Sequence, residues 1–315
     1  MHSARQQLLR HEAPATGGAL NASASGTGGG RLDTTSQGSR PSRGRWSTAL
    51  PTNAVLWIVG LAMVFPIYWL ISTSFLPKEQ ILGAEQRVIP NAFTLENYRL
   101  LLQNQEFWPA VRNSLIVSGV ITIAGAYFAT LAGYAFAKMN FSGRDLLFRI
   151  LLTTMMIPLM VSLTTNYVIM SKLGLLNSLW AVILPQLAPA FGIFWMRQFV
   201  ITTVPDEILE AARIDGAGEF MTFRKVVLPI LRPGVAGLMI WLFLSSWTQL
   251  LVPLTYLQDQ KTYPVFINSL RTFPAIPVTH LLIAASVLSM VPVIALFVFA
   301  QKSFVSGLSA GAVKG

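Results

Sequence analysis

Six apolar runs follow one another along the chain after residue 46, and each is long enough to cross a membrane. A hydrocarbon core about 30 Å thick needs roughly 20 helical residues at about 1.5 Å per residue. The pattern therefore predicts an all-α membrane protein with six transmembrane helices. The predicted spans cover approximately residues 52–75, 112–137, 148–170, 179–199, 233–257 and 280–301.

Proline and small residues modify this simple picture. Membrane helices tolerate proline as a kink where neighbouring groups satisfy the freed carbonyls, and it occurs inside several of the spans. In the second span, small residues recur at four-residue spacing, which lets two helix backbones approach closely. Packing within this chain and contact with a partner subunit are both compatible with that stripe. Its members are Gly125, Ala129, Gly133 and Ala137.

Residues 1–45 differ from the rest of the chain in composition. They are rich in Gly, Ser, Thr and Ala, carry six Arg, and have almost no large apolar side chains. Such a segment cannot bury enough surface to offset the entropy of ordering, so we expect a disordered tail. It also lacks the apolar centre of about 7–15 residues that a secretory signal needs.

The overall composition excludes several classes of protein. Apolar residues make up 53% of the chain and charged residues 11%, against about 25% charged in soluble domains, and the mean hydropathy is +0.56. The chain has no cysteine, and its three histidines (His2, His11 and His280) have no metal-ligand spacing. We therefore expect neither a metal site nor a cofactor, and no disulfide.

The net charge of +10 is interpreted as a signal for membrane orientation. With the N-terminal tail inside, the inside segments hold 16 Lys and Arg residues and the outside segments hold seven. Cytoplasmic segments carry such an excess, so both termini are predicted to be cytoplasmic in a multi-pass protein of the plasma (inner) membrane. This distribution does not indicate a nucleic-acid partner.

The predicted spans lack the groups that would drive transport by themselves. All 13 carboxylates lie in tails, loops or helix borders, so no intramembrane proton relay is expected. The chain has no GxxxxGK[ST] loop for ATP, and no constellation of catalytic side chains that would indicate a membrane enzyme. A transporter of this kind is driven by another subunit. An ATP-independent secondary transporter or channel is the alternative, although no convincing inverted repeat supports it.

The connection between the fourth and fifth spans carries the most informative pattern. Pro205 suits the first position of a helix, the acidic Asp206 and Glu207 face its positive end, and Gly216 is a plausible left-handed terminator. A second amphipathic segment follows and is expected to end at Leu228-Pro229. A solvated helical hairpin, with Glu210 and Arg213 forming an i,i+3 pair, is one interpretation of this pattern.

A family resemblance favours a different interpretation of the same loop. Glu210-Ala211-Ala212 is followed by three residues, Gly216, nine residues and then Val226-Val227-Leu228-Pro229. This resembles the EAA loop of permease subunits from ATP-binding-cassette (ABC) importers, and only Val226 departs from the usual isoleucine. Further strings resemble the sugar-importer branch of these permeases, and the last of them, residues 307–315, resembles the C-terminal tail of the six-span partner in the maltose-type permease pair. They are Asn113-Ser114-Leu115, Gly133 to Ala137, Met156-Ile157-Pro158, Leu173-Gly174-Leu175, Arg197-Gln198-Phe199 and residues 307–315.

The resemblance implies a type I ABC importer permease fold and a set of partners. These are a second permease subunit, two copies of an ABC ATPase, an extracytoplasmic sugar-binding protein and membrane lipid. The loop would be a coupling helix seated on the ATPase, and the C-terminal tail (307–315) would reach the same subunit through Gly311, Lys314 and Gly315. The implied ATPase-docking residues are Glu210, Ala211, Ala212, Asp215, Gly216, Ala217, Leu228 and Pro229.

Candidates for the sugar pathway come from side-chain chemistry. Aromatic faces stack on the C–H surfaces of sugars, and amides bond to their hydroxyl groups. Ordinary packing or interfacial anchoring would explain the same residues. The candidates at membrane depth are Asn166, Tyr167, Trp241, Trp247 and Gln249.

Overall fold

The computed structural model describes residues 49–82, 91–271 and 278–312, with side chains described for 53–81, 91–271 and 278–299. The predicted disordered tail, residues 1–45, lies outside these ranges, as do Lys314 and Gly315. The chain divides into two units at Leu56. Of the first unit, the structure describes only residues 49–56, where α1 begins. The helix packing and the sites described below lie in the second unit.

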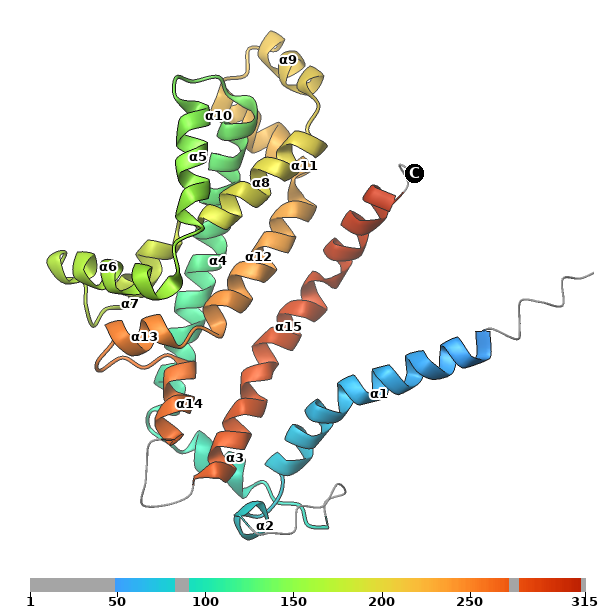
Figure 1. The fold of residues 1–315 in the computed structure, drawn as a ribbon, viewed down its shortest axis with the longest axis vertical. Helices are drawn as coiled ribbons and strands as arrows, with labels where there is room; N and C mark the ends of the chain where they lie inside the picture. The colour runs from blue at the N-terminus through green and yellow to red at the C-terminus, as the bar shows by residue number, and fades with distance from the viewer. Residues whose placement is uncertain (1–48, 83–90, 272–277, 313–315) are drawn as a thin grey trace, which may run out of the picture. The chain divides into compact units, whose positions relative to one another are not determined.

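The described residues form helices and no strand, as the sequence predicts (Figure 1). Two short elements are not α-helical, namely a 3-10 turn, η1, and a π-helical turn, η2. In chain order the elements are α1 (Ala49–Ser74), α2 (Lys78–Leu82), α3 (Glu96–Leu102), α4 (Phe107–Lys138), α5 (Arg144–Thr154), α6 (Leu159–Lys172), α7 (Leu179–Ile183), η1 (Leu184–Gln186), α8 (Ala190–Thr203), α9 (Asp206–Ile214), α10 (Glu219–Thr222), η2 (Phe223–Val227), α11 (Leu228–Ile230), α12 (Arg232–Trp247), α13 (Leu251–Tyr256), α14 (Tyr263–Arg271) and α15 (Thr279–Ala312).

Four stretches of the described helices are long and apolar enough to cross a membrane: Asn53–Ser74, Phe107–Lys138, Leu179–Thr203 and Thr279–Phe299. Two further pairs meet the same test but bend sharply. Helices α5 and α6 meet at 106°, and the segment Glu219–Ile230 meets α12 at 81°. The described helices give six membrane spans when each bent pair is counted as one span. The predicted all-α membrane fold is therefore confirmed.

Proline explains where both pairs bend. Pro158 precedes α6 as its N-cap residue, and Pro233 lies in the first turn of α12. A proline donates no backbone hydrogen bond and its ring clashes with the preceding turn, so a helix ends or bends there. The segment before α12 was expected to end at Leu228-Pro229. It continues instead through α11 to Ile230, because proline is accommodated in the first turn of that short helix.

Helix α4 is the central element of the fold and packs closely on α8 and α12. A Cβ added to Gly133 would lie 2.8 Å from both the backbone nitrogen of Arg197 and the Cβ of Met196. One added to Gly192 would lie 3.2 Å from the Cβ of Ala129. The small residues at these positions in α4 therefore serve helix packing inside this chain.

The N-terminal part of α4 anchors the region around α14. The Ser114 hydroxyl accepts a hydrogen bond from the backbone N–H of Tyr263 (2.7 Å), and Asn113 donates to the Lys261 carbonyl (3.0 Å). Phe107 and Phe266 are buried beside them in an aromatic cluster. This attachment sets the position of the cavity described below.

Helix α15 is longer than the predicted sixth span. Its backbone stays helical to Ala312, so residues 307–312 continue the helix. Within the second unit, the C-terminal end of α15 lies toward the same end of α4 and α12 as α9, whereas α3 and α14 lie toward the other end (Figure 1).

We expect Gly133→Ala to lower the thermal unfolding temperature of the purified protein. The new methyl group meets the backbone of α8, and overpacking of this kind costs about 1–3 kcal/mol. Gly119→Ala is the control, because a Cβ at Gly119 on the same helix has no heavy atom within 4 Å. Equal unfolding temperatures for the two variants would contradict the close packing.

Candidate functional site

The connection between α8 and α12 is the first candidate site, and its turns follow from local sequence. Pro205 is the N-cap residue of α9, with extended backbone angles. The carboxylates of Asp206 and Glu207 lie in the first turn, where the helix dipole favours negative charge. Gly216 has a φ of +78°, the left-handed conformation that glycine adopts without strain. The predicted helix and its glycine terminator are therefore confirmed, although the helix begins at Asp206, one residue after the predicted start at Pro205.

The predicted docking residues do not all face the same way. Glu210, Ala211, Asp215 and Gly216 are exposed, and Ala217 is half-buried. Ala212 is buried at 8% exposure together with Leu209, on the face of α9 that packs against the chain itself. Leu228 and Pro229 lie further along, in α11, and line a separate groove.

Exposed apolar side chains at this connection were not singled out from the sequence as contact residues. Ile214, the last residue of α9, is 86% exposed, and Phe220 is 59% exposed. Two residues along a helix rotate the side chain by about 200°, so Ile214 projects from the face opposite Ala212. That spacing is the signal that could have revealed it. Single exposed apolar side chains are common on protein surfaces, whereas several within one short connection outside the spans, here with Met221 at 50% exposure as well, are compatible with contact by another protein.

Polar contacts attach this connection to the end of α4. The Lys138 ammonium, whose side chain is 10% exposed, lies 2.6 Å from the Asp206 carboxylate. The Tyr134 hydroxyl donates to one oxygen of Glu219 (3.1 Å). Arg213 donates to the other oxygen through Nε (3.1 Å) and Nη2 (3.0 Å). The start of α9 and the start of α10 are thus both held against one transmembrane helix.

The expected pairing of Glu210 with Arg213 is wrong. Arg213 forms its ion pair with Glu219 instead, because the left-handed Gly216 turns the chain back and brings the start of α10 beside the last turn of α9. An i,i+3 spacing permits a contact within a helix, but a carboxylate across the turn that accepts two N–H bonds from the guanidinium competes with it.

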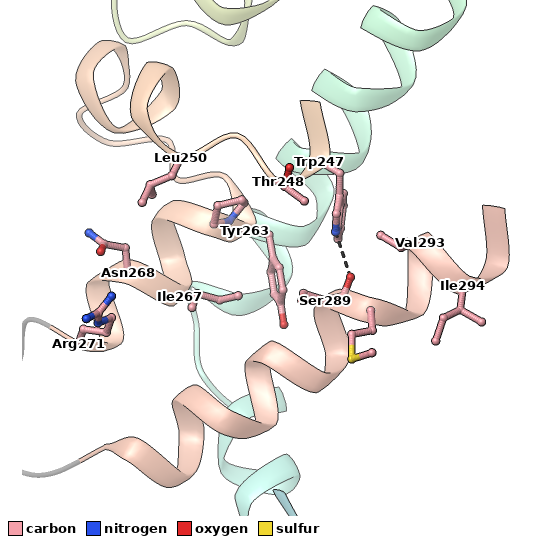
Figure 2. A pocket seen from close by; sticks show the side chains of 12 residues that line it. Trp247, Thr248, Leu250, Tyr263, Ile267, Asn268, Arg271, Ser289, Val293 and Ile294 are labelled. Carbon is pink, nitrogen blue, oxygen red and sulfur yellow. Dashed lines mark hydrogen bonds between the residues drawn. The ribbon is translucent and has the colours of Figure 1, made fainter. Parts of the chain in front are cut away.

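The second candidate site is a cavity of about 470 Å³ between the end of α12, α14 and α15 (Figure 2). The rings of Trp247 and Tyr263 are stacked, with centroids 5.9 Å apart and planes 23° apart. Trp247 donates to the Ser289 carbonyl (3.0 Å), and the Tyr263 hydroxyl donates to the Ala285 carbonyl (2.7 Å). Burial of this phenol raises the pKa of Tyr263 above its ordinary value.

The polar groups at this cavity come mainly from α14. Asn268 and the exposed Arg271 line it, together with Thr248 after the end of α12 (Figure 2). These residues were not among the sequence candidates, because their pattern alone resembles an ordinary amphipathic helix. They add a positive charge and an amide to walls that are otherwise mostly apolar.

The sequence candidates for the sugar pathway are dispersed rather than gathered. Trp247 lines the cavity, but Trp241 is 40% exposed and packs against Phe191, with ring centroids 4.6 Å apart. Tyr167 lies beside Tyr256, and Asn166, one residue earlier on α6, is half-buried.

Gln249 occupies a break between two helices. It follows the end of α12, and its side-chain oxygen accepts a hydrogen bond from the amide of Gln186 (2.9 Å). Gln186, at the end of η1, also donates to the Val182 carbonyl (3.0 Å). The two amides therefore join the interruption after α12 to the interruption between α7 and α8.

No group of three or more His, Asp or Glu side chains in the described ranges is placed to hold a metal ion.

Comparison with known proteins assigns residues 123–310 to the family described as "Binding-protein-dependent transport system inner membrane component". The chain is 35% identical to the arabinooligosaccharides transport system permease protein AraQ of Halalkalibacterium halodurans over 262 residues, covering 82% of this chain and 93% of that protein. It is 33% identical to the diacetylchitobiose uptake system permease protein DasC of Streptomyces coelicolor, covering 83% and 95% of the two chains.

A solved structure shares the fold. A chain from a bacterial ABC transporter involved in the import of the acidic polysaccharide alginate matches with a TM-score of 0.74 at 22% identity, covering 84% of this chain and 99% of that one.

We expect Glu219→Gln to accelerate amide hydrogen exchange across residues 213–222. Loss of the carboxylate weakens the bonds from Arg213 and Tyr134, while overall stability changes by no more than about 1 kcal/mol, because the ion pair is partly exposed. Glu210→Gln is the matched control, since the exposed Glu210 forms none of the ion pairs in the described segments. Equal exchange in both variants would contradict the attachment.

Proposed function

Because this chain belongs to the family of inner membrane components of binding-protein-dependent transport systems, we propose that it carries an oligosaccharide across the membrane as the permease subunit of an ABC importer. Both relatives named above are permeases of oligosaccharide uptake systems. The chain is a multi-pass membrane protein and not itself the enzyme, since ATP is hydrolysed on a partner subunit. A binding protein delivers the substrate, and a second permease completes the pathway.

The observation that carries this function is the attachment of an exposed apolar surface to a transmembrane helix. Ile214 and Phe220 project from the connection, which contacts Lys138 and Tyr134 at the end of α4. A displacement of that surface is transmitted to α4 through charge-assisted hydrogen bonds. Such a link is what ATP-driven closure of a partner needs in order to move the spans.

We place two ATPase copies on the cytoplasmic side, one of them against the exposed part of α9. Glu210, Ala211, Asp215, Gly216 and Ala217 would form the polar rim of this contact around Ile214. Ala212 would act indirectly, since its burial shapes α9 and not the contact surface. Gly311, in the last turns of α15, would approach the same subunit with Lys314 and Gly315.

Both chain termini would then be cytoplasmic. The excess of Lys and Arg at the proposed inside segments supports this orientation. So does the common direction of α9 and the C-terminal end of α15 (Figure 1).

The substrate pathway is proposed to pass the exposed ring of Trp241 and the amide pair of Gln186 and Gln249. An aromatic face and two amides suit a neutral sugar with many hydroxyl groups. Asn166 and Tyr167 on α6 would line the same pathway at a different depth.

The function is tested by uptake into proteoliposomes. The complex of this chain with its second permease, ATPase and binding protein is expected to accumulate labelled arabino-oligosaccharide or diacetylchitobiose inside the vesicles. Accumulation should require ATP on the side of the membrane where the ATPase lies. Vesicles with this chain alone should accumulate none. ATP-independent uptake by the single chain would support the alternative of a secondary transporter or channel.

Ile214→Asp is expected to reduce ATPase binding at least about tenfold, since a buried isoleucine contributes about 1.5–3 kcal/mol to a contact. The protein should still fold, because the side chain is 86% exposed. Pull-down of the ATPase by the tagged chain provides the measurement.

Leu95→Asp is the matched control, because Leu95 is 60% exposed beside α3 and far from the proposed contact. Unchanged ATPase binding by Ile214→Asp would remove Ile214 from the docking surface.

A further inference from the structure

A groove lies in the elbow where the chain bends before α12. The arm Glu219–Ile230 and helix α12 meet at 81°, and residues from both arms enclose about 500 Å³. Helix α12 is the apolar arm of this bent pair, and the other arm carries the basic Arg224 and Lys225. We therefore place the elbow at a membrane boundary, with α12 entering the hydrocarbon region.

Two guanidinium groups face this groove, one from each arm. Arg224 and Arg232 are exposed, and neither forms an ion pair or side-chain hydrogen bond with any described residue, whereas Lys138 and Arg213 do. No acidic residue lines the groove. The groove therefore has two positive charges available for an anion.

The remaining wall is apolar and continues along the span. Leu228 lies between the two arginines in sequence, and Val235 and Met239 follow on successive turns of α12. A soluble anion would leave this wall in contact with water, and an apolar peptide would leave the guanidinium groups without partners. An amphiphile with an anionic head at the boundary and a tail along the span satisfies both parts.

We propose that this elbow groove binds an anionic phospholipid. Its phosphate accepts hydrogen bonds from Arg224 and Arg232, which present the planar, multiply donating geometry that suits phosphate oxygens. Its acyl chains lie along Leu228, Val235 and Met239. Basic pockets between membrane helices bind lipid head groups in this way. The bound lipid would brace the angle between the α9–α11 connection and α12.

The test is native mass spectrometry of the full chain, in its purified complex, with added phosphatidylglycerol. The double variant Arg224→Gln/Arg232→Gln is expected to lose lipid retention, with each arginine contributing about fivefold. Lys225→Gln is the control, because Lys225 is an exposed neighbour that does not line the groove. Phosphatidylcholine should not be retained, and excess inorganic phosphate should not displace phosphatidylglycerol.

Several results would overturn the proposal. They are equal retention by the double variant, an equal loss in Lys225→Gln, or displacement of the lipid by inorganic phosphate. Loss of a protein subunit from the double variant with lipid retention unchanged would identify the groove as a protein interface instead. If the double variant does not assemble, the single variants Arg224→Gln and Arg232→Gln decide the question by the same readout. The measurement needs no transport, so its failure leaves the proposed function untouched.

Discussion

The rest of the structure depends on the close approach of α4 to α8. At Gly133 the backbone of α8 lies where a side chain would otherwise begin, and a side chain there would push the two helices apart. The attachments at both ends of α4 need this spacing. At one end Lys138 and Tyr134 hold the α9–α11 connection. At the other, Ser114 holds the start of α14 and with it the aromatic cavity. The single helix α4 therefore connects the proposed ATPase contact at its C-terminal end to α14 and the aromatic cavity near its N-terminal end.

The breaks after α12 and between α7 and α8 are the second feature on which the proposed function depends. Backbone groups freed at a break in a membrane helix need new partners, since no water is available to bond them in the hydrocarbon core. Gln186 meets part of this need through its bond to the Val182 carbonyl and then binds Gln249. Two interruptions are thereby joined by one amide pair, which lies on the proposed sugar pathway.

The connection between α8 and α12 separates two tasks on its two faces. Leu209, Ala212 and Phe223 are buried and give it a defined shape. Ile214 and Phe220 remain exposed and are available to a partner. The shape of the connection and the proposed ATPase contact thus involve different residues of the same short motif, so we expect substitutions at Ala212 and at Ile214 to act through different physical causes. The elbow that follows adds a third surface, basic and apolar together, at the membrane boundary.

Local rules made a large part of this protein predictable from sequence. Apolar run length determined the helical membrane fold, and a glycine in the left-handed region determined the end of α9, because both depend on few neighbouring residues. The spacing around Glu210-Ala211-Ala212 and Gly216 was sufficient to indicate the family. Tertiary structure alone decided that Ala212 faces inward and that the helices on either side of Pro158 meet at 106°. Each of these outcomes depends on which distant surfaces meet once the chain has packed around α4, and no local pattern contains that information.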